Sequence, residues 1–418
     1  MRKGVLLLFF QISCFSIFSQ DINYARKIID TLTTPYFAGR GAVENGEQKA
    51  ADFISNQFKR SGLKTINTSY FQEFDAPINT FPNRMEVSID GKLTTPGIDF
   101  IIDAASGSVD GNFDLFFYTE GYFSKKSELD KLIATGFFVN KFIVLEHNNT
   151  VKESEVFLQL KQNKVKATGI IFIEEKLTQH LSNVAKNYPT LHFKKGVLIN
   201  TSKSISVKID QELKSSYTSQ NVIGLIKGTE YPDSFIVLSA HYDHLGKMGN
   251  KVYFPGANDN ASGVAMLLDL AKYYAQNPQK KSIIFIAFGA EESGLVGSKY
   301  FVNNPLVPLS QINFVFNMDL MGTGSEGGMI VNGRVYESHF EKLTQINNEY
   351  KYLTVIKKRG KAANSDHYWF SEKGVPSFFL YLMGGISAYH DVDDVSKTLP
   401  LTKYNESFKL IRDFVDRL

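Results

Sequence analysis

Hydrophobic and polar residues follow a regular alternation in the second half of this chain of 418 residues. Short apolar runs typical of buried strands alternate there with amphipathic segments of helical period. The predicted strands are FIVLSA (235–240), SIIFIAF (282–288), INFVFNM (312–318) and SFFLYLM (377–383). The predicted helices cover about 262–276, 295–302, 337–350 and 401–418. This alternation predicts an α/β domain with a largely parallel central sheet.

The first half has a different pattern. Apolar residues recur at helical spacing on both sides of FAGRGAVENGE (37–47), which predicts a helix, a loop and a second helix between 22 and 62. Short β-rich runs then follow, namely FDLFFY (113–118), NKFIVLEH (140–147), TGIIFIEE (168–175) and KGVLINTS (195–202), with one helical candidate at 155–167. We therefore predict an inserted β-rich domain over 84–218. It separates an N-terminal part of the main domain (21–83) from its principal part (219–418).

The first twenty residues, MRKGVLLLFFQISCFSIFSQ, have a basic start, a short apolar run and small residues near the end. This pattern is typical of a secretory signal peptide and is too short for a membrane span. The only cysteine, Cys14, lies within it, and QISC is a poor match to a lipoprotein cleavage sequence, so lipidation at Cys14 is the lesser alternative. A mature chain without cysteine favours a secreted, periplasmic or cell-envelope protein of a bacterium.

Length and charge narrow the possibilities further. A chain of 418 residues exceeds the roughly 250 to 300 residues at which single cores stop growing, which favours two units. Lys and Arg number 46 against 43 Asp and Glu, for a net charge of +3. No basic stripe with interleaved aromatic residues is present, so nucleic acid is not expected as a partner. No other apolar run is long enough to span a membrane, and the oligomeric state is left open.

Residues that bind metals or transfer protons collect after each of the four predicted strands. They are His241 with Asp243, Glu291 with Glu292, Asp319, and Tyr389–His390 with Asp391, Asp393 and Asp394. The segment PGANDNASG (255–263) adds Asp259, with Gly256 and Gly263 permitting a tight path and Ser262 capping the next helix. Ligands bind at the carboxyl ends of parallel strands. One such residue commonly caps a helix, but the repetition indicates a site.

The chemistry of this set favours a metal centre. Histidines and carboxylates without a thiol suit Zn²⁺, and Mn²⁺ or Co²⁺ less well. If Asp259 bridges two metals, His241 and Asp319 complete one ligand set, and Glu292 and His390 complete the other. Two such metals activate a shared water as hydroxide. Glu291 is then the general base, Asp243 orients the imidazole of His241, and Asp394 does the same for His390.

Six motifs, in this order, resemble those of the M28 zinc peptidases, a family of co-catalytic aminopeptidases that also includes glutamate carboxypeptidases. They are HYDHLG, PGANDNASG, AFGAEESGLVGS, NMDLMG, SDHYWF and YHDVDD. The resemblance covers 219–418, the segment 32–63 is similar to the family's N-terminal element, and the β-rich segment resembles a diverged protease-associated domain. It implies a three-layer zinc-exopeptidase fold, with a central mostly parallel mixed sheet flanked by helices, and two zinc ions per chain.

The resemblance also implies roles for single residues. The implied ligands are His241, Asp259, Glu292, Asp319 and His390, with Glu291 as base and a cis peptide after Asp259. Tyr389 is implied as a donor to the developing oxyanion, or else it packs as an ordinary aromatic residue. Asp366 and His367 lie near the site in relatives without an assigned role. Asp391-Val392 stand where aminopeptidases of the family commonly have Thr-Pro, and the disulfide that some relatives have near the substrate pocket is impossible here.

The other histidines are not interpreted as ligands. His244 is interpreted as a loop residue, and the remaining ones have no ligand-like neighbours in the sequence, namely His147, His180, His192 and His339.

We therefore expect a secreted dizinc metallo-exopeptidase that hydrolyses peptide bonds, with metal-bound hydroxide as nucleophile. Its expected activity is that of an aminopeptidase acting on peptide or protein N-termini. The alternatives are a carboxypeptidase, a dipeptidase or a glutaminyl cyclase in the same fold, and a binding protein whose site has lapsed. Such cyclases work with one zinc, and a lapsed site would have lost ligands. The complete ligand set argues against both.

Overall fold

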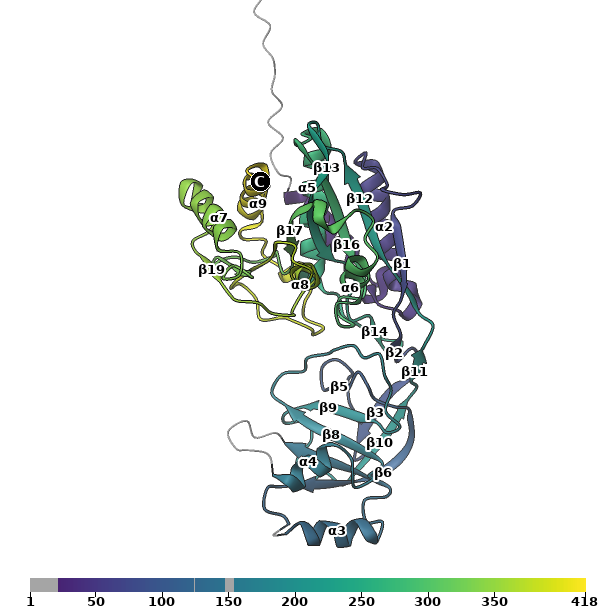
Figure 1. The fold of residues 1–418 in the computed structure, drawn as a ribbon. Helices are drawn as coiled ribbons and strands as arrows, with labels where there is room; N and C mark the ends of the chain where they lie inside the picture. Colours follow the sequence, from purple (N-terminus) through teal and green to yellow (C-terminus); the bar gives the residue numbers. More distant parts are fainter. Residues whose placement is uncertain (1–21, 124, 147–153) are drawn as a thin grey trace, which may run out of the picture.

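The computed structural model describes residues 22–123, 125–146 and 154–418. Two eight-stranded sheets organise it, one in the upper and one in the lower half of Figure 1. The predicted signal peptide with Cys14, and also His147, lie outside the described residues. Among the residues that are described, no helix has both the length and the apolar character needed to cross a membrane.

The upper sheet is mixed. In spatial order its strands are β1 (Phe71–Asp75), β12 (Thr218–Ile226), β16 (Lys281–Phe288), β13 (Tyr231–His241), β17 (Ile312–Met318), β20 (Ser377–Leu382), β18 (Gly328–Val331) and β19 (Ile356–Lys358). The four central strands β16, β13, β17 and β20 run parallel, so their carboxyl ends lie at one edge. Antiparallel pairing joins β12 to β16, β1 to β12, and β18 to β20.

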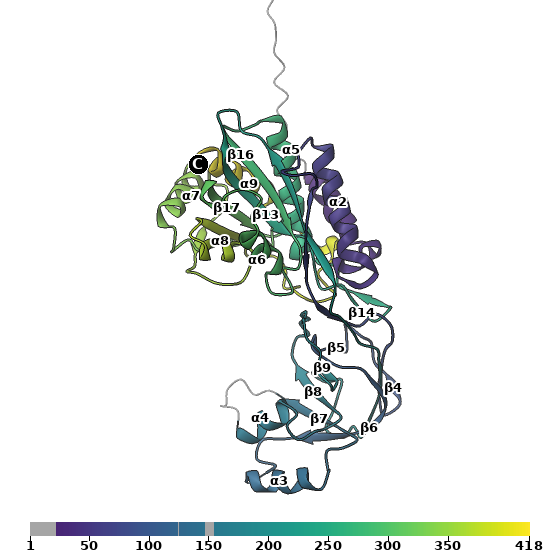
Figure 2. The same cartoon turned by 45° about the vertical axis from the view of Figure 1, so that its right-hand side comes forward.

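Helices cover both faces of this sheet (Figures 1 and 2). One layer contains α1 (Ile22–Leu32), α2 (Gly46–Arg60), α5 (Ser262–Gln276), α7 (Glu337–Tyr350) and α9 (Tyr404–Asp416), and the other α6 (Val296–Asn303) and α8 (His367–Glu372). Successive side chains of a strand point to opposite faces of the sheet, so each strand contributes apolar residues to both helix layers. On β13, Ile236 and Leu238 join the core beneath α5, whereas Val237 joins the core beneath α6 and α8. The predicted three-layer α/β fold is confirmed.

The lower sheet is formed between residues 85 and 209, and we call this stretch the insert. In spatial order its strands are β4 (Lys92–Leu93), β3 (Met85–Ile89), β10 (Ser204–Ile209), β6 (Val109–Tyr118), β7 (Lys141–Glu146), β8 (Gly169–Glu174), β9 (Thr190–Lys194) and β5 (Phe100–Ile102). Helices α3 (Lys126–Ala134) and α4 (Glu155–Lys161) cover one face, through apolar contacts of Leu129 and Leu160 with Ile143 and Ile170.

One prediction for the insert is wrong, and one of its helices was missed. The stretch 195–202 is not a strand but a turn between β9 and β10, because Gly196 has a left-handed φ of +91° that breaks the extended run. The helix α3 was also not foreseen, because its short, weakly amphipathic sequence has one buried apolar residue, Leu129. Its apolar period is therefore too faint to detect.

The insert shares its core with the upper part of the molecule. Two short antiparallel two-stranded sheets lie at the junction (Figure 1), β2 (Ile78–Thr80) with β11 (Glu212–Lys214) and β14 (Lys247–Met248) with β15 (Val252–Tyr253). From the loop after β13, Leu245, Met248 and Phe254 pack into the apolar cluster of the insert. The insert is therefore docked on the same loop that follows the predicted ligand His241.

Candidate functional site

The parallel strands bring the predicted ligands to one edge of the upper sheet. His241 is the last residue of β13, Asp319 follows β17, and Glu292 lies in the turn after β16. Asp259 precedes α5, and His390 comes from the long segment after β20. The five side chains converge, and all except the partly exposed Glu292 belong to buried residues. The topology thus gathers residues that are up to 149 positions apart in the sequence.

Asp259 lies between the two predicted ligand sets. Its Oδ1 is 3.3 Å from Nε2 of His241, which is also 3.3 Å from Oδ2 of Asp319. Its Oδ2 is 3.0 Å from Nε2 of His390, which is 3.3 Å from Oε2 of Glu292. Each oxygen of Asp259 therefore faces a different histidine and a different second carboxylate.

These separations fit zinc. Tetrahedral zinc with bonds of about 2.0 to 2.1 Å to nitrogen and oxygen holds its ligand atoms about 3.3 to 3.4 Å apart. His241 Nε2 and Asp319 Oδ1 are also buried without a hydrogen-bond partner within the described residues, as atoms aimed at a cation would be. The trio His241, Asp259 and Asp319 thus has the chemistry and the spacing of a metal site.

The electrostatics of the site favour positive charge beside Asp259. Burial alone lowers the pKa of His241, but the carboxylates of Asp319 and Glu291 outweigh it and raise that pKa well above its ordinary value. Burial likewise opposes protonation of His390, yet Glu292 and Asp259 raise its pKa to about 11. Burial raises the pKa of Asp259, but the two histidine rings that face its oxygens hold that pKa well below its usual range.

The segment PGANDNASG takes an irregular path that only small residues allow. The predicted cis peptide between Asp259 and Asn260 is confirmed. Gly256 has a φ of +59°, and a Cβ there would lie 2.2 Å from the carbonyl oxygen of Asp259. The predicted cap by Ser262 is wrong, because Asn260 Oδ1 accepts the hydrogen bond from the N–H of Gly263 at 2.9 Å. Ser262 Oγ instead donates to the carbonyl of Asn258 at 2.7 Å.

Asp243 does not orient His241 in the predicted way. Its carboxylate accepts hydrogen bonds from the N–H groups of Glu291 and Glu292, at 3.0 and 3.2 Å. The imidazole Nδ1 of His241 instead bonds to the main-chain carbonyl of Asp243 at 3.2 Å and is 3.8 Å from its carboxylate. The side chain of Asp243 therefore fixes the turn that carries the predicted base and ligand.

Asp394 also has a different role from the predicted one. Its carboxylate accepts hydrogen bonds from the N–H groups of Asn258 and Asp259, at 2.9 and 3.0 Å. It fixes the backbone of the Asp259 segment, whereas Nδ1 of His390 faces the carbonyl of Gln179, 2.9 Å away, in the insert.

The predicted base and the predicted oxyanion donor lie beside the ligands. Burial, with Asp366 and Glu292 nearby, raises the pKa of Glu291 well above its ordinary value. Tyr389 is 43% exposed, and its ring stacks on that of His390 with centroids 4.0 Å apart. Both side chains are thus placed near the converging ligands, and their roles stay predictions.

His244 is part of the site, so its interpretation as an ordinary loop residue is wrong. It does lie in the loop after β13, but its ring is fully buried. Its Nδ1 is 2.8 Å from Oε1 of Glu292, whose other oxygen faces His390. Burial lowers the pKa of His244, which favours a neutral ring that donates Nδ1–H to the carboxylate. The three-residue spacing from His241 in HYDHLG was the available signal.

Sequence reasoning also missed Arg40, whose side chain is fully buried behind the site. The guanidinium donates hydrogen bonds to five main-chain carbonyls, at 2.6 to 3.3 Å, those of Leu32, Tyr242, Pro255, Gly256 and Asp259. Burial lowers its pKa to about 10, so it stays charged at neutral pH. Arg40 thus ties the His241 and Asp259 segments together and places a fixed positive charge near the carboxylates.

Asp366 and His367, which lie near the site in relatives, are both buried here. Asp366 is fully buried, burial raises its pKa to about 7, and its carboxylate has no hydrogen-bond partner within the described residues. The next residue, His367, is also buried.

The expectation that His180 and His192 lack ligand-like neighbours is wrong, because both have such neighbours in the folded chain. The His180 ring is 5.4 Å from that of His390, and His192 lies between Asp103 and Glu174, at 3.6 and 3.1 Å.

Comparison with known proteins places this arrangement in context. Residues 221–415 match the model of peptidase family M28. The chain is 28% identical over 347 residues to Aminopeptidase YwaD of Bacillus subtilis, an alignment that covers 76% of this chain and 69% of that protein. It is 38% identical over 111 residues to a probable zinc metalloprotease of Pyricularia oryzae, of which it spans 22%.

A solved structure is similar over most of the chain. BSAP, a zinc aminopeptidase from Bacillus subtilis, superposes with a TM-score of 0.73 and 22% identity, over 95% of both chains. At this identity the likeness is one of fold, and it extends over the insert as well as the upper sheet.

Replacing His244 tests its contact with Glu292. We expect His244→Phe to weaken zinc binding by about 10- to 100-fold, because partners that orient a metal ligand contribute on that scale. Zinc titration against a chelating dye measures the change. His339→Phe is the matched control. His339 lies on helix α7, away from the ligands, and packs on Phe314 of β17. Equal zinc affinity in the two variants would contradict the role of His244.

Replacing Arg40 tests its support of the Asp259 segment. Arg40→Met removes the donor of five hydrogen bonds to carbonyls, and we expect the free energy of unfolding to fall by about 3 kcal/mol or more. Arg26→Met is the matched control, because the partly buried Arg26 bonds to two carbonyls, those of Ser396 and Leu399, both at 2.6 Å. Urea unfolding measures both variants. A loss in Arg40→Met no larger than in Arg26→Met would show that the guanidinium contributes little.

Proposed function

The chain belongs to peptidase family M28, and we propose on that premise that it is a secreted dizinc exopeptidase, an aminopeptidase that releases N-terminal residues from peptides. The observation that carries this proposal is the position of Asp259, with one oxygen facing His241 and the other facing His390. A single metal would not need a carboxylate presented on both sides.

The proposed ligand sets follow from that position. His241, Asp259 and Asp319 would hold one zinc, and Asp259, Glu292 and His390 the other. His244 would orient Glu292 through the hydrogen bond to Oε1. Zinc, when bound, polarises the scissile carbonyl and makes a neighbouring water acidic enough to react near neutral pH.

Glu291 is proposed as the general base. It is held on the same turn as Glu292 by the carboxylate of Asp243, so one side chain can reach the water while its neighbour binds metal. Glu291 would take the proton from the attacking water and return it to the leaving amine. The hydroxyl of the partly exposed Tyr389 would donate a hydrogen bond to the oxygen that gains negative charge.

Substrate class and location rest on separate support. The aminopeptidase activity is proposed because the relative with the longest alignment reported above is named an aminopeptidase. Secretion to a bacterial envelope or medium is proposed from the signal-like sequence of residues 1–20. The peptide's free N-terminus would be the group that distinguishes substrates from other amides.

Two adjacent glutamates provide a matched pair of variants. We expect Glu291→Gln to lower kcat by about 10²- to 10⁴-fold, the usual contribution of a general base, while two zinc ions per chain remain bound. We expect Glu292→Gln to lose zinc as well as activity, because it removes a ligand charge. Steady-state kinetics with metal analysis measures both. Unchanged turnover in Glu291→Gln would overturn its assignment as base.

A panel of chromogenic amides tests the reaction itself. We expect hydrolysis of aminoacyl amides with a free amine, no hydrolysis of their acetylated forms, loss of activity with a chelator and recovery with zinc. Cleavage only of N-blocked peptides with a free carboxylate would indicate a carboxypeptidase, and cleavage of free dipeptides alone a dipeptidase. Cyclisation of N-terminal glutamine would indicate a cyclase. A chain that binds no zinc would be a lapsed peptidase.

A further inference from the structure

Among the described residues, the hydrogen bonds between the insert and the predicted ligands all involve His390. The long connection between β8 and β9 crosses to the upper part of the molecule and meets the segment that carries His390. Gln179 and His390 form a reciprocal pair of hydrogen bonds. The N–H of Gln179 donates to the carbonyl of His390 at 2.9 Å, and Nδ1 of His390 lies 2.9 Å from the carbonyl of Gln179. Both residues are buried.

This pair fixes the imidazole in the form that a metal requires. The Gln179 carbonyl can only accept, so Nδ1 of His390 carries the proton and donates it. Nε2 is then the nitrogen that can bind a metal, and it faces Asp259 and Glu292, at 3.0 and 3.3 Å. His241 obtains the same orientation from the carbonyl of Asp243, within its own loop. The two histidines therefore differ in which part of the chain holds them.

The segment that leads to His390 is poorly buried. None of residues 383–389 is buried, although Ile386 packs on the upper core, and His390 itself has a left-handed φ of +53°. Lys176 of the insert supplies further contacts, since its Nζ donates to the carbonyl of Ser387 at 2.8 Å and pairs with Asp391 at 3.1 Å. Val392 packs against the apolar core of the insert.

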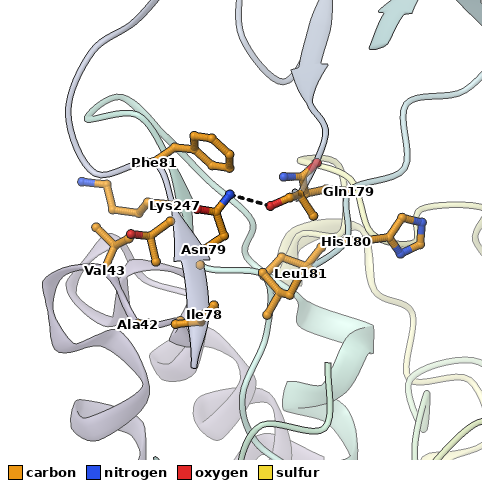
Figure 3. A pocket seen from close by; sticks show the side chains of 14 residues that line it. Ala42, Val43, Ile78, Asn79, Phe81, Gln179, His180, Leu181 and Lys247 are labelled. Atoms are coloured by element: carbon orange, nitrogen blue, oxygen red, sulfur yellow. Dashed lines mark hydrogen bonds between the residues drawn. The ribbon is translucent and has the colours of Figure 1, made fainter. Parts of the chain in front are cut away.

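Figure 3 shows how the connection reaches the junction. Gln179, His180 and Leu181 follow one another along one wall of a pocket whose other walls carry Ile78 and Phe81. His180 points away from this pocket, and its ring lies 5.4 Å from that of His390. The connection therefore lies between the junction and the site. A movement of the insert would move the carbonyl of Gln179, to which His390 bonds.

We infer that residues 176–180 of the insert are a positioning element for His390, so that zinc affinity at the Glu292–His390 half of the site depends on how the insert is docked. This inference rests on the proposed dizinc function. The half held by His241 and Asp319 has no hydrogen bond from the insert among the described residues, because Nδ1 of His241 bonds to the carbonyl of Asp243 in its own loop. Loosening the insert thus releases one zinc before the other.

Two variants test the inference through zinc affinity. Gln179→Pro removes the N–H that bonds to the carbonyl of His390, and we expect one of the two zinc ions to bind about 10- to 100-fold more weakly. Lys176→Met removes the contacts to Ser387 and Asp391, and we expect a smaller loss of up to about tenfold at the same ion. Competitive chelator titration of the full chain gives both dissociation constants, and His390→Ala identifies which ion is affected.

Two controls separate positioning from general damage. Gln179→Ala keeps both main-chain hydrogen bonds, so its zinc constants should match those of the wild type. Lys195→Met removes exposed ion pairs with Glu175 and Glu146 in the insert, with no contact to the His390 segment, and should also leave both constants unchanged.

The outcomes distinguish this inference from the proposed function. Selective weakening of the ion that His390→Ala loses supports it, with both controls unchanged. Two unaltered constants in both Gln179→Pro and Lys176→Met overturn it, and so does equal weakening of both ions. A wild-type chain that binds fewer than two zinc ions overturns the dizinc proposal instead. If Gln179→Pro does not fold, as judged by circular dichroism, Lys176→Met alone decides.

Discussion

Mutual repulsion among buried carboxylates is the constraint on which the rest of this structure depends. Asp243, Asp259, Asp319, Asp366 and Asp394 are all buried at one edge of a sheet, beside Glu291 and Glu292. Charges of one sign in a medium of low dielectric repel strongly, so such a cluster persists only with compensation. Arg40, the imidazoles and main-chain N–H groups provide it within the chain, and cations bound between the histidines would complete it.

Compensation and positioning are distributed over three parts of the chain. The parallel strands supply the convergence point, because their ends meet at one edge. The first helical segment supplies Arg40, whose guanidinium bonds to the carbonyls of the neighbouring loops. The insert supplies the carbonyl that faces His390. A site that looks like a property of the upper sheet is therefore assembled from segments on both sides of the insert.

The sequence predicted the elements whose apolar period is strong, and it missed those held by distant partners. INFVFNM and the helix after PGANDNASG have the predicted bounds. The strand is buried on both faces and the helix on most sides, so each leaves a long apolar run in the sequence. His244 and Arg40 were missed because their partners come from other segments. The roles of Asp243 and Asp394 were wrong because neighbouring N–H groups compete for the carboxylate, which residue spacing does not show.

The fivefold hydrogen bonding of Arg40 has a consequence for synthesis of the chain. Four of its five carbonyl partners lie 202 to 219 residues further on, in segments that leave the ribosome after the whole insert. At about 5 to 20 residues per second, that delay is on the order of 10 to 40 s. During this interval the guanidinium has no native acceptors from those segments. The first two helices are thus committed to their final packing only after translation has passed residue 259, whereas the strands of the insert can already pair.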